Sequence, residues 1–244
     1  MKHLTPSFSF RALAYGCLLA ASALLLGSCK KDKVETPEPA LAVYAAGYEN
    51  NSAGKAVAKV WKNGTATPAL SDGTSDAVAY AMAVAGGDVY VAGYEVNAAR
   101  YAVAQVWKNG TATSALTGAT IYAVANALAV VGGDVYAAGY ERNTAGRAVA
   151  KVWKNGAATV PLTDGTSSAA ALSIAVAGSD VYVAGYESNT AAQPVAKMWK
   201  NGAATTPLTD GTKKSIAYAL AVVGSDVYAA GYEPNAAGKA VAKV

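Results

Sequence analysis

The stretch Val181-Tyr182-Val183-Ala184-Gly185-Tyr186-Glu187 decides the fold, because close copies of it return along the chain at one fixed interval. Its last three residues, Gly-Tyr-Glu, occupy residues 47–49, 93–95, 139–141, 185–187 and 231–233, so each copy starts 46 residues after the one before. A period of this length is typical of one supersecondary unit repeated in tandem. The sequence therefore predicts a repeat architecture.

One copy of the repeat divides into four predicted strands. The strands are residues 171–177, 181–187, 194–199 and 203–208. Gly178-Ser179-Asp180 predicts a turn between the first two strands. Asn201-Gly202 predicts a type I′ hairpin turn before the last strand, since such a turn needs positive φ at both central residues. We therefore predict an all-β chain in which each copy is a four-stranded antiparallel sheet.

Neither face of this sheet is polar. In the second strand Tyr182 and Tyr186 point to one face, and Val181 and Val183 point to the other. A sheet that is apolar on both faces needs cover on both, and radial stacking of the copies in a β-propeller provides that cover. We expect the tryptophan that ends the third strand of each copy to fill the gap between sheets: Trp61, Trp107, Trp153 and Trp199.

The order of these features resembles a kelch-like β-propeller blade. The resemblance covers residues 43–244 and consists of an apolar strand, a tight glycine turn, a Val-Tyr-Val-Ala-Gly strand, a loop and an aromatic-bearing hairpin. Two features depart from the kelch pattern: Gly47 is followed by Tyr48 and not by a second glycine, and Trp61 is the one late aromatic of its copy. The resemblance thus implies the blade topology and no particular partner.

The fold class expected from these arguments is a β-propeller of 46-residue, four-stranded blades, about five in number, with incomplete terminal blades. The repeats begin at a second strand near Val43, and they stop at Val244, one residue before the tryptophan position. We therefore expect a repeat domain at residues 41–244 that is truncated at its C-terminus, with three strands in its first set, four in each of the next three sets and three in the last.

The N-terminus resembles the signal of a bacterial lipoprotein. Basic residues at its start are followed by an apolar run at residues 12–26, and Leu26-Gly27-Ser28-Cys29 matches the lipobox. The resemblance implies a signal peptide at residues 1–28, a lipidated Cys29 and a charged, proline-containing tether at residues 29–40. Membrane contact through this anchor is expected. In that family an Asp after the cysteine marks inner-membrane retention, so Lys30 implies the outer membrane, with the protein facing the periplasm or the cell surface.

Removal of the signal excludes several kinds of chemistry from the rest of the chain. The single histidine, His3, and one of the two cysteines, Cys17, both lie in the predicted signal peptide. The remaining chain then lacks the residues for Ser-His-Asp or Cys-His catalysis and for common zinc sites. The net charge of +4 gives no basic surface of the kind that binds nucleic acid. No cofactor is expected.

The candidate ligand-binding residues are a glutamate and an asparagine that follow the Gly-Tyr pair in every copy. They are Glu49, Asn51, Glu95, Asn97, Glu141, Asn143, Glu187, Asn189, Glu233 and Asn235. In a propeller they lie on one rim, where they could bind sugar hydroxyls beside the tyrosines. The alternative interpretation is structural: the asparagine forms the loop turn, and the glutamate binds backbone amides or a lysine.

A Thr-Asp-Gly-Thr loop suggests calcium, but we expect a turn and no metal there. Each such loop offers one carboxylate, as at Asp164, whereas calcium takes six to eight oxygen ligands. The sequence as a whole predicts a non-catalytic, lipid-anchored binding module for a glycan or a protein partner. The alternatives are a fragment of a propeller-type polysaccharide-degrading enzyme and a structural spacer.

Overall fold

The computed structural model describes residues 41–159 and 161–244, which form strands, turns and loops only. The predicted Cys29, the signal peptide and the tether lie outside the described residues. The strands are β1 (Tyr44–Asn50), β2 (Ala56–Lys62), β3 (Thr65–Ala66), β4 (Ala77–Ala85), β5 (Asp88–Val96), β6 (Ala102–Lys108), β7 (Thr111–Ala112), β8 (Ala123–Val131), β9 (Asp134–Arg142), β10 (Ala148–Lys154), β11 (Ala157–Ala158), β12 (Ala169–Ala177), β13 (Asp180–Ser188), β14 (Pro194–Lys200), β15 (Ala203–Ala204), β16 (Ile216–Val223), β17 (Asp226–Pro234) and β18 (Ala240–Lys243). Within the described ranges, no helix is long and apolar enough to cross a membrane.

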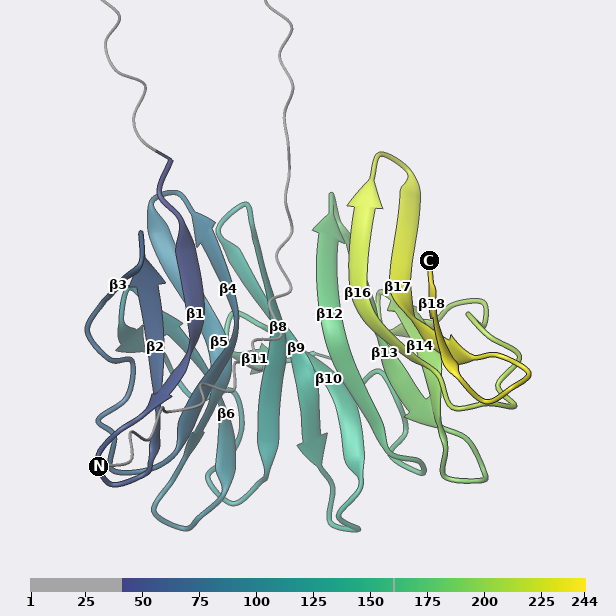
Figure 1. The fold of residues 1–244 in the computed structure, drawn as a ribbon, viewed down its shortest axis with the longest axis horizontal. Helices are drawn as coiled ribbons and strands as arrows, with labels where there is room; N and C mark the ends of the chain where they lie inside the picture. Colours follow the sequence, from purple (N-terminus) through teal and green to yellow (C-terminus); the bar gives the residue numbers. More distant parts are fainter. Residues whose placement is uncertain (1–40, 160) are drawn as a thin grey trace, which may run out of the picture. The chain divides into compact units, whose positions relative to one another are not determined.

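These strands form five antiparallel sheets, which confirms the all-β prediction. Sheets β1–β3 and β16–β18 have three strands, and sheets β4–β7, β8–β11 and β12–β15 have four (Figure 1). The strand numbers per sheet are those expected from the repeat. Strands that are adjacent in the chain are also adjacent in each sheet.

The fourth strand of each complete set is shorter than predicted. In the copy analysed above, residues 203–208 were expected to be extended, but β15 comprises Ala203–Ala204 alone. Pro207 has no N–H to donate to a ladder. The Thr205 hydroxyl also donates to the carbonyl of Met198, which replaces regular pairing there.

The Asn-Gly turns have the geometry that the sequence predicted. Asn201 has φ of 51° and Gly202 has φ of 87°, so both central residues are left-handed, as a type I′ turn requires. The side chain of Asn201 also accepts a hydrogen bond from the backbone N–H of Val181 at 2.8 Å. The turn is thereby tied to the neighbouring strand.

A β-bulge that was not predicted from the sequence interrupts strands β4, β8, β12 and β16. In β4 the register against β5 shifts between Ala79 and Ala81, so Tyr80 is the extra residue. Gly93 lies opposite, and a Cβ added to it would be 1.9 Å from the Val78 carbonyl oxygen. Glycine is required at this position because the bulged backbone occupies the place of a side chain.

Consecutive sheets pack against one another through their first strands. Strand β4 contacts β8, β8 contacts β12, and β12 contacts β16, while β1 contacts β4. Figure 1 shows the five sheets next to one another in chain order. Asn126, the bulge residue of β8, donates to the carbonyl of Ala171 in β12 at 2.9 Å, so polar contacts as well as apolar ones join neighbouring sheets.

Three of the four tryptophans are core residues, as predicted. Trp107 is 0% exposed and packs on Val60 and Leu70 of the preceding sheet. Trp153 and Trp199 occupy the same place one and two sheets later. Trp61 differs from the prediction in being only partly buried, since no described residues form a sheet on its outer side. The apolar gap between two sheets is therefore filled by the tryptophan of the second.

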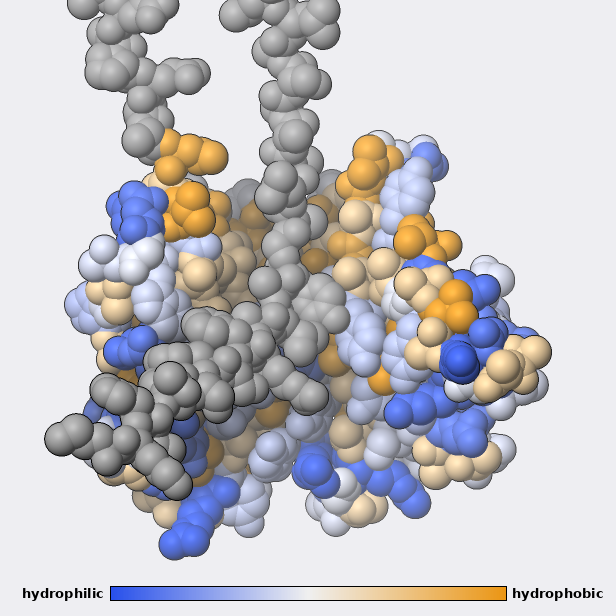
Figure 2. Space-filling model, in the orientation of Figure 1, coloured by the Kyte–Doolittle hydropathy of each residue, from blue (hydrophilic) through white to orange (hydrophobic). Residues whose placement is uncertain are grey.

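Apolar side chains are exposed around the first and the last sheets. Leu208, which follows β15 and faces the last sheet, is 38% exposed, whereas its equivalents Leu70, Leu116 and Leu162 are each 7% exposed beneath the next tryptophan. Figure 2 shows hydrophobic residues on the surface near β1 and around β16–β18. This pattern follows from a repeat whose sheets rely on their neighbours for cover.

Candidate ligand-binding rim and tyrosine groove

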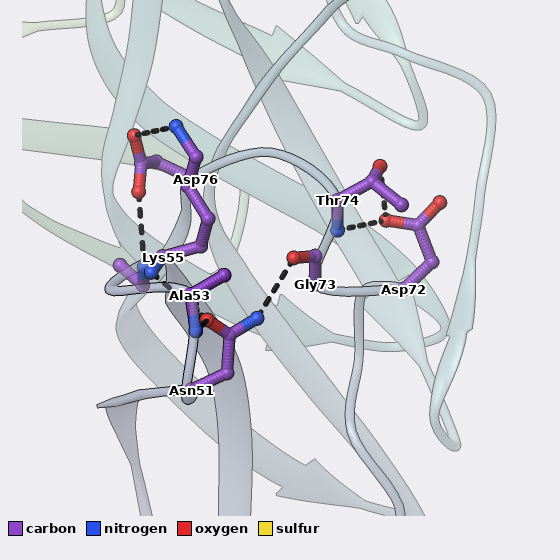
Figure 3. A network of polar contacts seen from close by, with 8 residues as sticks. Asn51, Ala53, Lys55, Asp72, Gly73, Thr74 and Asp76 are labelled. Carbon is purple, nitrogen blue, oxygen red and sulfur yellow. Dashed lines mark hydrogen bonds and ion pairs between the residues drawn. The ribbon is translucent and has the colours of Figure 1, made fainter.

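The loop between the second and third strands of each sheet is organised by its asparagine. Asn51 accepts hydrogen bonds at its Oδ1 from the backbone N–H groups of Ala53 and Lys55, both at 3.0 Å (Figure 3). Its Nδ2 donates to the carbonyl of Gly73 at 2.9 Å, which ties the loop to the turn before β4. This arrangement is that of an Asx turn with an additional tether.

The other four asparagines also hold their own loops. Their side-chain oxygens accept loop N–H groups at Asn97, Asn143, Asn189 and Asn235. The amides of Asn97, Asn143 and Asn189 donate to the following turn. The geometry thus gives these residues a structural role, and a ligand-binding role for them stays a prediction.

Four of the five candidate glutamates pair with a lysine on the third strand of their own sheet. The pairs are Glu49 with Lys59, Glu141 with Lys151, Glu187 with Lys197 and Glu233 with Lys243. The Glu141 and Lys151 side chains are 19% and 15% exposed, so this pair is shielded between sheets. A ligand would therefore compete with Lys151 for the carboxylate of Glu141.

Glu95 differs from the other candidate glutamates because position 105 holds glutamine and not lysine. The side chain of Gln105 is buried and donates to the carbonyls of Val106 and Thr113, at 2.7 and 2.9 Å. Partial burial, with a smaller effect from the charge of Asp72, raises the pKa of Glu95. Among the candidate glutamates, Glu95 therefore differs in having no lysine partner on the neighbouring strand.

The Asp-Gly-Thr loops are turns, as expected. Asp72 accepts hydrogen bonds from the backbone N–H of Thr74 at 2.8 Å and from its hydroxyl at 2.7 Å (Figure 3). The bond from the backbone N–H, and to a smaller extent the bond from the hydroxyl, lowers the pKa of Asp72. Asp164 and Asp210 make the same bonds with Thr166 and Thr212. In residues 41–159 and 161–244, no three His, Cys, Asp or Glu side chains gather as a metal site would need.

At the opposite end of the sheets, the two hairpin turns of a sheet share a polar contact. Asp88 accepts from Lys108 at 2.8 Å and from the amide of Asn109 at 2.7 Å, and Lys108 also lies 5.2 Å from the centre of the Tyr90 ring. The hydrogen bond from Lys108, and to a smaller extent the one from Asn109, lowers the pKa of Asp88. Asp134 and Asp180 repeat this arrangement in the next two sheets. The charged side chains at this end of the sheets are thus paired within the sheet that carries them.

A groove lined by tyrosines lies at the end of the sheets that carries the asparagine loops. It has a volume of about 440 Å³ and joins three sheets, with Tyr48 from β1, Tyr80 from β4, Tyr94 from β5 and Tyr122 from the segment before β8. Tyr48 and Tyr80 are each 53% exposed. The rings of Tyr80 and Tyr94 lie 6.0 Å apart between centroids, with their planes tilted by 40°. The groove therefore presents flat aromatic surface to the solvent.

Two of the groove tyrosines, Tyr80 and Tyr94, keep their hydroxyls protonated at neutral pH. Burial, with a smaller contribution from Tyr80, raises the pKa of Tyr94 to about 12. Burial also raises the pKa of Tyr80. Each ring therefore offers an apolar face and a neutral hydroxyl that can both donate and accept.

Two charged groups line the same groove. Asp76 accepts from the backbone N–H of Ala56 at 2.9 Å and lies 3.7 Å from Lys55 (Figure 3). Arg100 is exposed in the loop between β5 and β6. Apolar surface with a few convergent polar groups is the usual composition of a small-molecule or sugar site.

The groove was not predicted as a site from the sequence. Its tyrosines come from three copies of the repeat, and Tyr80 projects because of the bulge. The signal in the sequence was variation between copies. The positions equivalent to Tyr80 in later copies hold Asn126, Leu172 and Tyr218. The positions equivalent to Arg100 hold Gly or Ala. The groove thus combines tyrosines that every copy shares, Tyr48 and Tyr94, with residues that vary between copies, Tyr80 and Arg100.

Comparison with known proteins adds no family to this description. The chain matches no protein-family model, and no curated protein is similar to it in sequence.

Proposed function

We propose that this chain is a non-catalytic, lipid-anchored binding module of the bacterial cell envelope with the fold of a β-propeller. The stacking of five sheets through their first strands, with a tryptophan in three of the four gaps, supports the propeller arrangement. The sequential antiparallel order of the four-stranded sheets supports the resemblance to a kelch-like blade that we propose. The lipid anchor is proposed on the sequence around Cys29 alone.

The ligand we propose is a glycan, bound in the tyrosine groove. The observation that carries this proposal is the aromatic surface of Tyr48, Tyr80, Tyr94 and Tyr122 at one end of the sheets. The C–H faces of a sugar ring pack on aromatic rings, and its hydroxyls can bond the tyrosine hydroxyls and Asp76. A protein partner is the competing outcome, and it would be expected to need a larger surface than this groove.

Loss of the two most exposed groove tyrosines is expected to weaken glycan binding at least 10-fold. Each stacked ring contributes about 0.5–1.5 kcal/mol beyond its buried area, and 1.4 kcal/mol is a tenfold change in affinity. The measurement is glycan-array binding followed by calorimetric titration of the best oligosaccharide, for the full chain and for Tyr48→Ala/Tyr80→Ala. Tyr228→Ala is the matched control, because Tyr228 is 48% exposed and does not line the groove. Unchanged binding by the double variant, or no glycan binding at all, contradicts the proposal.

Lipidation is expected at Cys29. Mass spectrometry of the protein extracted from membranes should show an N-terminal, acylated Cys29, and Cys29→Ala should leave the chain unanchored, because stable attachment needs more than one acyl chain or an equivalent second signal. A variant that stays bound to the membrane would argue against this anchor.

A catalytic function is the second candidate, and Glu95 is the observation that favours it. Glu95 has no lysine partner among the described residues, unlike the other four candidate glutamates, and burial, with a smaller effect from Asp72, raises its pKa, which is the direction expected for a general acid. Release of reducing ends from an oligosaccharide that the chain binds, abolished by Glu95→Gln, would support hydrolysis. Binding without release supports the non-catalytic proposal.

A further inference from the structure

The side chain of Arg100 brings a positive charge to the tyrosine groove, and this charge has no partner among the described residues. The guanidinium of Arg100 makes no hydrogen bond or ion pair with any described residue. The other charge that lines the groove, Asp76, is already engaged by Ala56 and Lys55. A ligand in the groove would therefore meet an available cation.

The backbone at Arg100 makes this side chain unfavourable for stability. Arg100 has φ of 65°, in the left-handed region that glycine adopts without steric cost. The equivalent positions are Gly54, Ala192, Gly146 and Gly238, and they have φ of 73°, 57°, 75° and 74°. A charged side chain held in a strained conformation beside a groove is a reason to look for function there.

A second arginine near the groove, Arg142, has a structural role. Arg142 donates through a guanidinium nitrogen to the carbonyl of Gly146 at 3.0 Å, and its guanidinium lies 5.2 Å from the centre of the Tyr122 ring. Arg142 thus fixes its own loop, whereas the side chain of Arg100 fixes nothing among the described residues.

We propose that Arg100 makes the groove selective for acidic glycans, by pairing with the carboxylate of a uronic acid whose ring packs on the groove tyrosines. Guanidinium and carboxylate form two parallel hydrogen bonds, which sets the orientation of the sugar as well as its charge. This inference rests on the proposed glycan-binding function and adds the class of sugar and the residue that selects it.

The test compares acidic oligosaccharides with their methyl esters, which keep the sugar and remove the charge. Tetragalacturonate and oligomers of mannuronate and of glucuronate serve as probes, each beside its fully esterified form, in titrations with the full chain. We expect at least one acid to bind about 10-fold or more tightly than its ester. Arg100→Gly should remove that difference, and it should also raise the melting temperature by roughly 2–4 °C.

Ala192→Gly is the matched control for the backbone effect. It relieves the same left-handed strain in another loop, at a residue that does not line the groove, so it should raise the melting temperature without changing binding. If acids and esters bind equally well, or if Arg100→Gly keeps the preference for acids, Arg100 does not select the ligand although glycan binding stands. If no glycan binds, the inference and the proposed function both fail.

Discussion

Trp107→Ala is expected to lower the free energy of unfolding by about 3–5 kcal/mol, whereas Trp61→Ala should cost less than half as much. The same residue type ends the same strand in both copies, but Trp107 is 0% exposed and Trp61 is only partly buried. Trp107 packs on Ala58, Val60 and Leu70 of the preceding sheet, and its removal leaves a cavity between two sheets. The loss therefore includes both the transfer of the indole and the void that remains.

Urea denaturation followed by circular dichroism measures both values, with Trp153→Ala as a second buried example. Trp153 fills the equivalent gap one sheet later and should behave as Trp107 does. Equal costs for Trp61→Ala and Trp107→Ala would mean that packing between sheets does not depend on the sheet that precedes the tryptophan. That result would contradict the stacked arrangement.

Gly93→Ala is expected to be as disruptive as a core cavity, at about 3 kcal/mol or more, although it adds a single methyl group. An added Cβ would lie 1.9 Å from the carbonyl oxygen of Val78 and 3.1 Å from the Cα of Ala79. Both are backbone atoms, so strand β4 would have to move away from β5 and lose its bulge. A flexible side chain could rotate out of the way, but the backbone of a paired strand cannot.

Gly47→Ala is the matched control, because the sequence around Gly47 is similar to that around Gly93 and its surroundings in the structure differ. A Cβ at Gly47 would meet only the ring of Trp61, at 3.4 Å. Its unfolding free energy should change by about 1 kcal/mol or less. If both alanine variants were equally mild, the bulged strand would not press on the second strand as the structure has it.

The strands and turns could be predicted from the sequence because their signals are local. Asn201-Gly202 determines its own turn, and the 46-residue interval reveals the unit from the sequence alone. The bulge could not be predicted in this way, because the residue at its position varies among tyrosine, asparagine and leucine: Tyr80, Asn126, Leu172 and Tyr218. It becomes intelligible only when Gly93 is seen against the backbone of the neighbouring strand.

The candidate site was harder to predict because its residues are distant in the chain. The Glu and Asn residues that recur in every copy attracted attention, yet the structure places Asn51 in a turn and Glu141 beside Lys151. For these Glu and Asn residues, repetition reflects what every copy needs for folding. The groove depends on Tyr48, Tyr80 and Tyr122, which meet only when neighbouring sheets stack.

The most direct test of the central claim is a crystal structure of the chain with the best-binding oligosaccharide from the array. We predict an intact sugar chain whose rings lie on Tyr80 and Tyr94 in the groove. A sugar bound at the opposite end, among Asp88, Lys108 and their equivalents, or a cleaved sugar in the groove, would contradict a non-catalytic glycan-binding site on this rim.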